Sequence, residues 1–175
     1  MNNEEYKNKK LEYAYTLAKR KKFFKKARAI VFERNNILLI KVTYPNKEKE
    51  EEYLLPGGGV DSNETVKQAV AREAEEEYAV KVKPTKYLGR QYYKVKMNFN
   101  GEDFVSNRVE YYYLCEVESY DNDNHFGIDG EFSSNDKVYE KIKISIDELK
   151  KISPKKLNHM KEEVYEKLIN IFKNL

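Results

Sequence analysis

Cysteine, tryptophan and long apolar runs are scarce or missing in this chain of 175 residues, and each absence excludes something. The single cysteine, Cys115, excludes an internal disulfide, and its place in an apolar run predicts a small buried core residue rather than a nucleophile. No apolar run approaches the roughly 20 residues of a membrane-spanning helix, and the first residues lack the apolar stretch of a signal peptide. With 36% charged residues and no tryptophan, the chain is predicted to be a soluble, cytoplasmic protein.

Neither an internal repeat nor a linker-like composition breaks the chain, so its length predicts one domain with a substantial core. Charge, however, is distributed unevenly. Residues 1–28 hold ten Lys or Arg against three Glu, a net of +7, so the remainder carries 3 − 7 = −4 of the total +3. We therefore expect a basic N-terminal helical extension at 1–25 and the main domain at 26–175.

The basic run at 19–26 interleaves lysine and arginine with two phenylalanines, and it has two interpretations. The favoured one is a solvated helix end on the side of the domain, with Tyr13, Leu17 and Phe24 packing inward. The other is contact with RNA or another anionic surface through mixed aromatic and basic side chains. In both cases the positive field would attract polyphosphate compounds.

Alternating apolar patterns and turn signals predict a mixed α/β protein with helices on both sides of one sheet. Asn35-Asn36 and Asn100-Gly101 are typical of hairpin turns, and Ser62 or Asn63 is expected to cap the second helix. In the last helix, helical spacing predicts core positions at Leu157, Val164, Leu168 and Ile171. The expected elements are helices at 4–22, at 63–78 and from Ser153-Pro154 onward, and strands at 27–32, 37–42, 53–55, 85–99, 108–117 and 137–144.

A stripe of carboxylates follows the glycine turn at 57–59. At about 100° of rotation per residue, Glu73, Glu76 and Glu77 fall within one sector of their helix. Like charges at this spacing repel, a cost without compensation unless a cation lies among them, and hard oxygen ligands suit Mg²⁺ or Mn²⁺. Val66, Val70 and Ala74 are expected to form the buried ridge beside the stripe, while Ala69 leaves room for the ions.

The spacing of these residues resembles the Nudix box, Gly-x5-Glu-x7-Arg-Glu-apolar-x-Glu-Glu-x-Gly-apolar. Leu55-Pro56 precede the box, which spans residues 58–80, and one fixed position departs from the pattern. Ala79 stands where the family has a glycine that often needs a left-handed backbone, which predicts a cost of about 1 kcal/mol or another local geometry. The chain thus resembles the Nudix hydrolases, the MutT-like pyrophosphohydrolases, through Gly58, Glu64, Arg72, Glu73, Ala74, Glu76, Glu77 and Val80.

The resemblance implies an α/β/α sandwich around a mixed sheet, with the main domain at 26–175 as the Nudix domain. It also implies Mg²⁺- or Mn²⁺-dependent hydrolysis of a phosphoanhydride bond by a metal-activated water. The substrate would be a nucleoside diphosphate linked to another moiety, such as a nucleoside triphosphate, a nucleotide sugar or an RNA end. The implied metal ligands are Glu73, Glu76, Glu77 and the carbonyl of Gly57, and the implied catalytic set is Arg72, Glu73, Glu76 and Glu64, with Arg72 holding a glutamate and Glu64 bracing the loop.

The general base and the substrate contacts stay open. The base is either a glutamate of the box or a carboxylate on a distant loop, where Glu131 is the favoured candidate within an acidic stretch that has no Lys or Arg from 109 to 136. Glu110 and Tyr112 share one side of a predicted strand and, together with Glu131, are candidates to contact substrate, although packing is the commoner role of strand aromatics. The proline and tyrosine that mark family subgroups for ADP-ribose and dinucleoside polyphosphates are not evident.

A second class of function is a Nudix-like module that binds a nucleotide, or regulates in response to one, without cleaving it. Three acidic side chains crowded on one helix favour the hydrolase, because a protein without a cation to bind gains nothing from that repulsion. The stretch after Ile144 is too short for an added helix-turn-helix domain. The sequence leaves open whether the protein is a monomer or a dimer.

Overall fold

The computed structural model describes residues 3–45, 50–120, 137–157 and 162–172. The predicted strands are all present, and most are longer than expected. The first helix ends at Lys19, before the basic run finishes, because Lys21 has a left-handed backbone with φ of 54°. The elements are α1 (Asn3–Lys19), β1 (Phe24–Glu33), β2 (Asn36–Thr43), β3 (Glu51–Leu54), α2 (Val66–Tyr78), β4 (Val80–Phe99), β5 (Glu102–Tyr120), β6 (Val138–Ser145), α4 (Ile146–Leu149), a 3₁₀ turn (Pro154–Lys156) and α5 (Glu162–Phe172).

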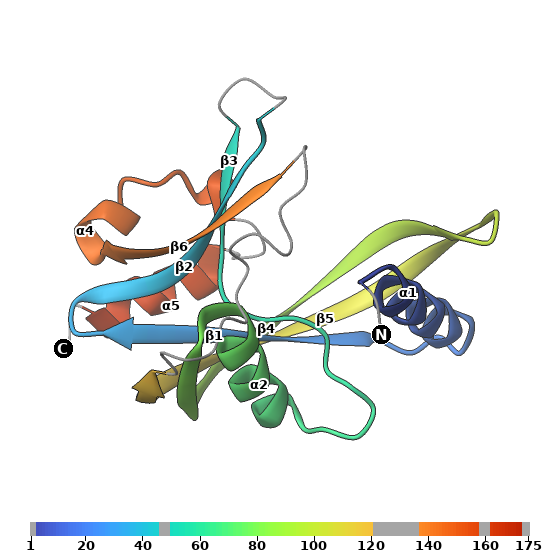
Figure 1. Cartoon of the computed structure of the whole chain (residues 1–175), viewed down its shortest axis with the longest axis horizontal. Helices are drawn as coiled ribbons and strands as arrows, with labels where there is room; N and C mark the ends of the chain where they lie inside the picture. The colour runs from blue at the N-terminus through green and yellow to red at the C-terminus, as the bar shows by residue number, and fades with distance from the viewer. Residues whose placement is uncertain (1–2, 46–49, 121–136, 158–161, 173–175) are drawn as a thin grey trace.

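Six strands form one mixed sheet in the order β3-β2-β1-β5-β4, with β6 paired to β2 (Figure 1). Strand β1 joins the two parts of the sheet. Its first eight residues, 24–31, pair in parallel with β5, and its last two, Phe32 and Glu33, pair with β2 across the expected hairpin turn. The glycine turn runs along the other side of β1, where the Ala27 amide donates to the Gly58 carbonyl at 2.9 Å. This pairing fixes the turn against the sheet.

Strand alternation divides the interior into two cores, one on each face of the sheet. In β1, Ala29 and Val31 face the core under α2, whereas Ile30 faces the core under α5. The predicted α/β/α arrangement is therefore confirmed, and Cys115 is a buried core residue as expected, 3% exposed. Leu157, Val164 and Leu168 are buried in the second core, and Ile171 packs against it.

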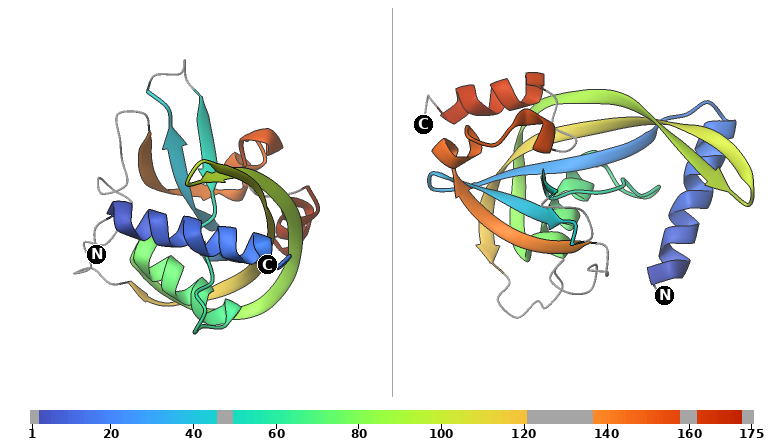
Figure 2. Two further views of the ribbon diagram at one scale, coloured as in Figure 1. Left: turned by 90° about the vertical axis from the view of Figure 1, so that its right-hand side faces the viewer. Right: turned by 90° about the horizontal axis from the view of Figure 1, so that it is seen from above.

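The β4–β5 hairpin extends well beyond the rest of the sheet and carries α1 at its end. Asn100 and Gly101 form its turn, both with positive φ, as the dipeptide predicts. Helix α1 contacts β5, β1 and β4. Figures 1 and 2 show α1 at this end of the molecule, opposite α4 and α5. The basic extension is thus folded onto the domain.

The second helix begins later than the sequence suggested. Its N-cap is Thr65, not Ser62 or Asn63, because Thr65 and Gln68 form a capping box in which each side chain bonds the other's backbone amide. Val70 and Ala74 are fully buried, while Val66 packs at the edge. Ala69 is also fully buried in this core, so its small side chain serves packing rather than free space beside the carboxylates.

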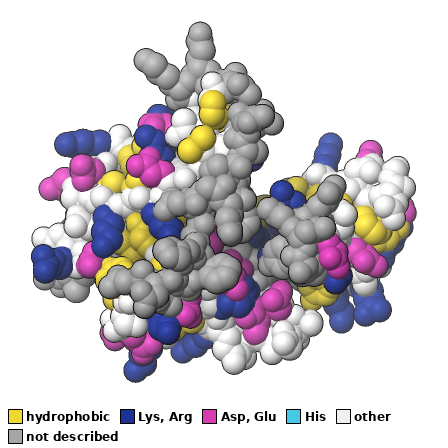
Figure 3. Space-filling view, in the orientation of Figure 1, with side chains coloured by type: hydrophobic (Ala, Val, Ile, Leu, Met, Phe, Trp, Pro, Cys, Tyr) yellow, Lys and Arg dark blue, Asp and Glu magenta, His cyan; other side chains and the backbone are white. Residues whose placement is uncertain are grey.

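Lysine and arginine are mixed with aspartate and glutamate over the face of the molecule drawn in Figure 3. Within the described residues, no helix is both long and apolar enough to span a membrane.

The predicted final helix from Ser153-Pro154 is instead a 3₁₀ turn at Pro154–Lys156 and, further on, the separate helix α5.

Candidate active site

Two glycines allow the backbone to pass between β1 and the acidic face of α2. Gly57 has φ of 149°, and a β-carbon there would lie 2.1 Å from the Ala27 carbonyl oxygen. At Gly58 a β-carbon would lie 2.4 Å from Oε1 of Glu73. A side chain at Gly57 would collide with the backbone, so that position requires glycine, whereas a side chain at Gly58 would displace the carboxylate of Glu73.

Arg72 connects the helix to the turn through its whole guanidinium. Glu64 accepts two hydrogen bonds from it, from Nε at 3.1 Å and Nη2 at 2.8 Å, and the Gly59 carbonyl accepts another from Nη2 at 2.9 Å. Nη1 donates to Glu76 at 2.8 Å and lies 3.0 Å from Oε1 of Glu73. Hydrogen bonding to Arg72 lowers the pKa of Glu64. A planar fork with five donors suits this task, and a lysine could not replace it.

Of the box carboxylates on α2, Glu73 is buried, 5% exposed, and Glu77 is partly buried. Glu77 accepts a hydrogen bond from the Gly57 amide at 2.7 Å. Burial raises the pKa of Glu73, and burial together with the nearby Glu73 charge raises the pKa of Glu77 to about 7. Glu76, in contrast, is exposed, with 54% of its side chain accessible. The free protein therefore holds two acidic groups in surroundings that disfavour their negative charge.

The residues present fit a divalent cation, although they are not preassembled around one. Among the described residues no group of three or more His, Cys, Asp or Glu side chains converges closely enough to enclose a metal. However, Oε1 of Glu73 is buried without an aligned hydrogen bond, beside the Arg72 guanidinium at 3.0 Å, and all the side chains offer hard oxygen donors. A cation beside Glu73 and Glu77 would satisfy that oxygen and offset the repulsion between the two charges.

The carbonyl of Gly57, the fourth predicted ligand, accepts a hydrogen bond from Nη1 of Arg28 at 2.6 Å. A carbonyl oxygen has two lone pairs, so this bond leaves one for a second partner. Arg28 also donates to the Leu55 carbonyl at 3.1 Å and from Nε to Glu110 at 2.6 Å. Buried beneath the turn, Arg28 thus fixes the backbone on which the predicted ligand lies.

Sequence reasoning missed Arg28. Its signal was a charged residue at the centre of the apolar run Ala27-Arg28-Ala29-Ile30, since a charge buried in a strand requires a partner. That partner is Glu110, which also accepts hydrogen bonds from Gln91 at 2.6 Å and Tyr112 at 3.0 Å. Together these four side chains form a buried polar network across β1, β5 and β4.

Of the three predicted substrate contacts, two lie inside this network. Glu110 and Tyr112 are both fully buried, with 0% exposure, and both are bonded within the protein. Neither presents an accessible surface to a ligand, because both side chains are enclosed in the buried polar network. Glu131, the third, lies outside the described residues together with most of the acidic stretch. The structure therefore leaves the choice of general base open.

Ala79 has the left-handed backbone expected at the position of the box glycine. Its φ is 56° and its ψ is 36°, and its amide closes the helix by donating to the Glu75 carbonyl at 2.9 Å. The chain accepts the steric cost of alanine here rather than adopting another exit from the helix. No predicted metal ligand is displaced by the substitution.

The fold and the site together define an α/β/α protein in which an acidic helix is held against a glycine turn. A sequence model of the NUDIX domain matches residues 22–168, which include the whole box. The chain therefore belongs to the Nudix family of hydrolases. A search of curated proteins found no match.

Three solved structures illustrate the similarity of fold. A NUDIX hydrolase from Nitrosomonas europaea is 18% identical, with a TM-score of 0.58 over 87% of this chain and 90% of that one. The E. coli ORF135 protein is 16% identical, with a TM-score of 0.52 over 85% and 90%. A UDP-X diphosphatase is 17% identical, with a TM-score of 0.54 over 93% and 70%. At these identities the likeness concerns the fold alone.

Proposed function

We propose that this protein hydrolyses a phosphoanhydride bond in a nucleoside diphosphate linked to another moiety, with Mg²⁺ or Mn²⁺ as cofactor. The observation that carries the proposal is the arrangement of Glu73 and Glu77. Both are held against the glycine turn, and Oε1 of Glu73 is buried without an aligned hydrogen bond, beside the Arg72 guanidinium at 3.0 Å. Such an arrangement is costly in a free protein and becomes favourable when a cation and its phosphate ligand arrive.

The protein's own residues would then perform distinct tasks. Glu73, Glu76, Glu77 and the Gly57 carbonyl would hold the cation, which when bound neutralises phosphate charge and lowers the pKa of a bound water. Arg72 would act as a positioning residue, because it fixes Glu76 relative to the turn. Glu64 would brace the loop through Arg72 and through the Asp61 amide, which donates to it at 2.8 Å.

The alternative is a module that binds a nucleotide without cleaving it. Its ligand site could use the same carboxylates, so the difference lies in turnover rather than in binding. Two observations favour hydrolysis. The box has its complete set of acidic residues, and Arg72 holds Glu76 and Glu64 in place by hydrogen bonds. RNA ends are included among the candidate substrates because the N-terminal segment is basic.

Product analysis with purified protein tests the proposal. Nucleoside triphosphates, nucleotide sugars, ADP-ribose, dinucleoside polyphosphates and triphosphate-ended RNA are incubated with Mg²⁺ or Mn²⁺, and the products are separated by chromatography. Glu76→Gln and Glu77→Gln are compared with Glu75→Gln. Glu75 lies on the same helix and is paired only loosely with Lys81, at 3.6 Å, so it is a matched control.

Metal-dependent cleavage that is lost in the first two variants and kept in Glu75→Gln supports the hydrolase and identifies its substrate class. Ligand binding that requires metal but gives no product on any substrate supports the binding module instead. Cleavage that survives both Glu76→Gln and Glu77→Gln contradicts the assigned roles.

A further inference from the structure

A pocket of about 320 Å³ lies directly beside the glycine turn, between α1 and the sheet. Its volume is at the lower end of the range of about 300–1,000 Å³ typical of small-molecule sites. The turn contributes Gly58 and Gly59, so the pocket borders the backbone that faces the box carboxylates. It is lined by Lys7, Lys10, Leu11, Ala14, Phe24, Lys26, Gly58, Gly59, Met97 and Arg108.

The lining combines an apolar surface with four basic residues and no acidic residue, and burial lowers the pKa of one of them, Lys26, to about 7. Leu11, Phe24 and Met97 provide apolar contact, and the guanidinium of Arg108 lies 5.4 Å from the centre of the Phe24 ring. Arg108 donates from Nη2 to the sulfur of Met97 at 3.1 Å, while its buried Nε has no hydrogen-bond partner. Arg108 therefore has a fixed position in the wall of the pocket, and its charge lies at a defined place beside the apolar surface.

Lys10 connects this pocket to the box. A β-carbon built on Gly59 would lie 4.0 Å from Cε of Lys10, and the Lys10 charge acts electrostatically on both Glu64 and Glu73. A ligand with several phosphates could therefore reach from the box carboxylates along the turn to Lys10 without leaving the protein surface. The N-terminal helix, rather than the sheet alone, supplies this cation.

The helix is held in place by aromatic contacts with the end of the hairpin. The ring of Tyr15 lies 5.1 Å from that of Phe99 and 5.3 Å from that of Phe104, and Tyr13 lies edge-on to Phe24 at 6.0 Å. Tyr15 also donates a hydrogen bond to Glu102. Ala14, which lines the pocket, is 1% exposed. These contacts fix α1 as one wall of the pocket.

We propose that this pocket binds the nucleoside monophosphate portion of the substrate, with the base against Phe24, Met97 and Leu11 and the phosphate beside Lys10 and Arg108. The inference rests on the proposed function for the position of the reacting phosphates, and it assigns to α1 a role in substrate recognition. The volume suits one nucleoside phosphate, and the apolar surface together with the cations matches the two halves of such a ligand.

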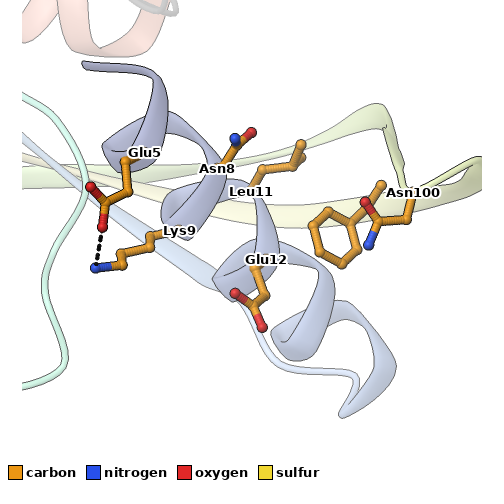
Figure 4. A pocket seen from close by; sticks show the side chains of 7 residues that line it. Glu5, Asn8, Lys9, Leu11, Glu12 and Asn100 are labelled. Atoms are coloured by element: carbon orange, nitrogen blue, oxygen red, sulfur yellow. Dashed lines mark ion pairs between the residues drawn. The ribbon is translucent and has the colours of Figure 1, made fainter. Parts of the chain in front are cut away.

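The opposite side of α1 provides a matched control. A second surface pocket of about 580 Å³ lies there, lined by Glu5, Lys9, Glu12 and Asn100 among others (Figure 4). Lys9 pairs with Glu5 at 3.2 Å, one turn away on the same helix, and it does not line the pocket beside the glycine turn. Lys9→Gln therefore removes the same charge from the same helix without touching the proposed site.

Binding of AMP, GMP, CMP and UMP is measured without metal by equilibrium dialysis, for the parent, Lys10→Gln, Arg108→Gln and Lys9→Gln. Tripolyphosphate is the probe that lacks a base. Loss of one charged contact is expected to weaken nucleoside monophosphate binding about tenfold in Lys10→Gln and Arg108→Gln, and less than about twofold in Lys9→Gln. With a hydrolysed substrate, KM rises by a similar factor while kcat changes little.

Melting temperatures separate a binding defect from loss of α1 packing. Equal affinity for nucleoside monophosphates in the parent and Lys10→Gln would overturn the inference. An equal loss of affinity in Lys9→Gln and Lys10→Gln would also overturn it. So would a result in which Lys10→Gln weakens the binding of tripolyphosphate but not of nucleoside monophosphates. Nucleotide binding that needs Lys10 in a protein without hydrolytic activity would support the pocket and contradict the proposed function. Hydrolysis with an unchanged KM in Lys10→Gln would support the proposed function and contradict the pocket as the substrate site.

Discussion

Ala79 is a single residue whose backbone conformation carries a measurable cost. A left-handed conformation costs alanine more than glycine because the β-carbon approaches the following carbonyl oxygen. Ala79→Gly is therefore expected to raise the free energy of unfolding by about 1 kcal/mol, even though it removes a methyl group. Urea unfolding followed by circular dichroism measures the change. Lower stability in Ala79→Gly would mean that packing of the methyl group outweighs the backbone strain.

Arg72 tests whether geometry or charge matters in the box. Arg72→Lys keeps the positive charge but cannot donate at once to Glu64, Gly59 and Glu76, which the guanidinium does through three nitrogens. We expect kcat on the identified substrate to fall about a hundredfold, because small misplacements of reacting groups reduce the rate by about this factor. Steady-state kinetics with saturating metal gives the value. Near-parent kcat in Arg72→Lys would show that a point charge is sufficient.

At the scale of the elements, the polar network joins three strands through one ion pair. Arg28 and Glu110 are buried, so Glu110→Gln leaves a buried charge without its counter-charge and is expected to destabilise the protein by about 3–5 kcal/mol. Adding Arg28→Met should recover part of that loss, because no unpaired buried charge then remains. The free energy of unfolding of both variants, measured by denaturant unfolding, tests this expectation. Losses that simply add would contradict coupling between the two residues.

The same pair predicts how stability depends on acid. Arg28 and Lys26 lower the pKa of Glu110 below its ordinary value of 4.5 despite burial, which acts in the opposite direction. The pair's contribution is therefore fully present above pH 4.5 and is lost as pH falls through the lowered pKa of the folded state. Unfolding measured from pH 7 down to 3 should show a steeper acid loss in the parent than in Glu110→Gln. Parallel curves would exclude this contribution.

The elements also show what a single sequence can and cannot predict. The box residues were predictable because a spacing pattern on one helix is local, and the strands followed from local alternation. The start of α2 was misplaced because several adjacent residues can cap a helix, and only the pairing of Thr65 with Gln68 decides between them. Arg28 was missed, and the burial of Glu110 and Tyr112 was not predicted, because burial across three strands depends on non-local pairing.

Over the whole molecule, the box and the N-terminal helix form two sides of one region, although they are far apart in sequence. The basic extension does not lie apart from the domain, since α1 packs over the sheet and lines a pocket beside the glycine turn. Uneven charge along the sequence therefore becomes local complementarity in space, because Lys10 of α1 acts electrostatically on Glu64 and on Glu73 of α2. On the proposed function, this arrangement would draw anionic substrate toward the box before any metal contact forms.

Metal binding should be visible in the stability of the entire fold. A cation that binds only the folded state stabilises it by about 2.7 kcal/mol at a hundred times Kd, which corresponds to about 5–10 °C in Tm for a chain of this size. Calorimetry with Mg²⁺ or Mn²⁺ against a chelator measures the gain for the parent, Glu77→Gln and Glu75→Gln. In Glu77→Gln the metal-free protein should be at least as stable as the parent, because one of two crowded charges is gone, but the gain with metal should fall by more than half. An equal gain in Glu77→Gln and the parent would place the cation elsewhere. The full gain is expected in Glu75→Gln, because the Glu75 carboxylate pairs with Lys81 at 3.6 Å and is not one of the predicted ligands.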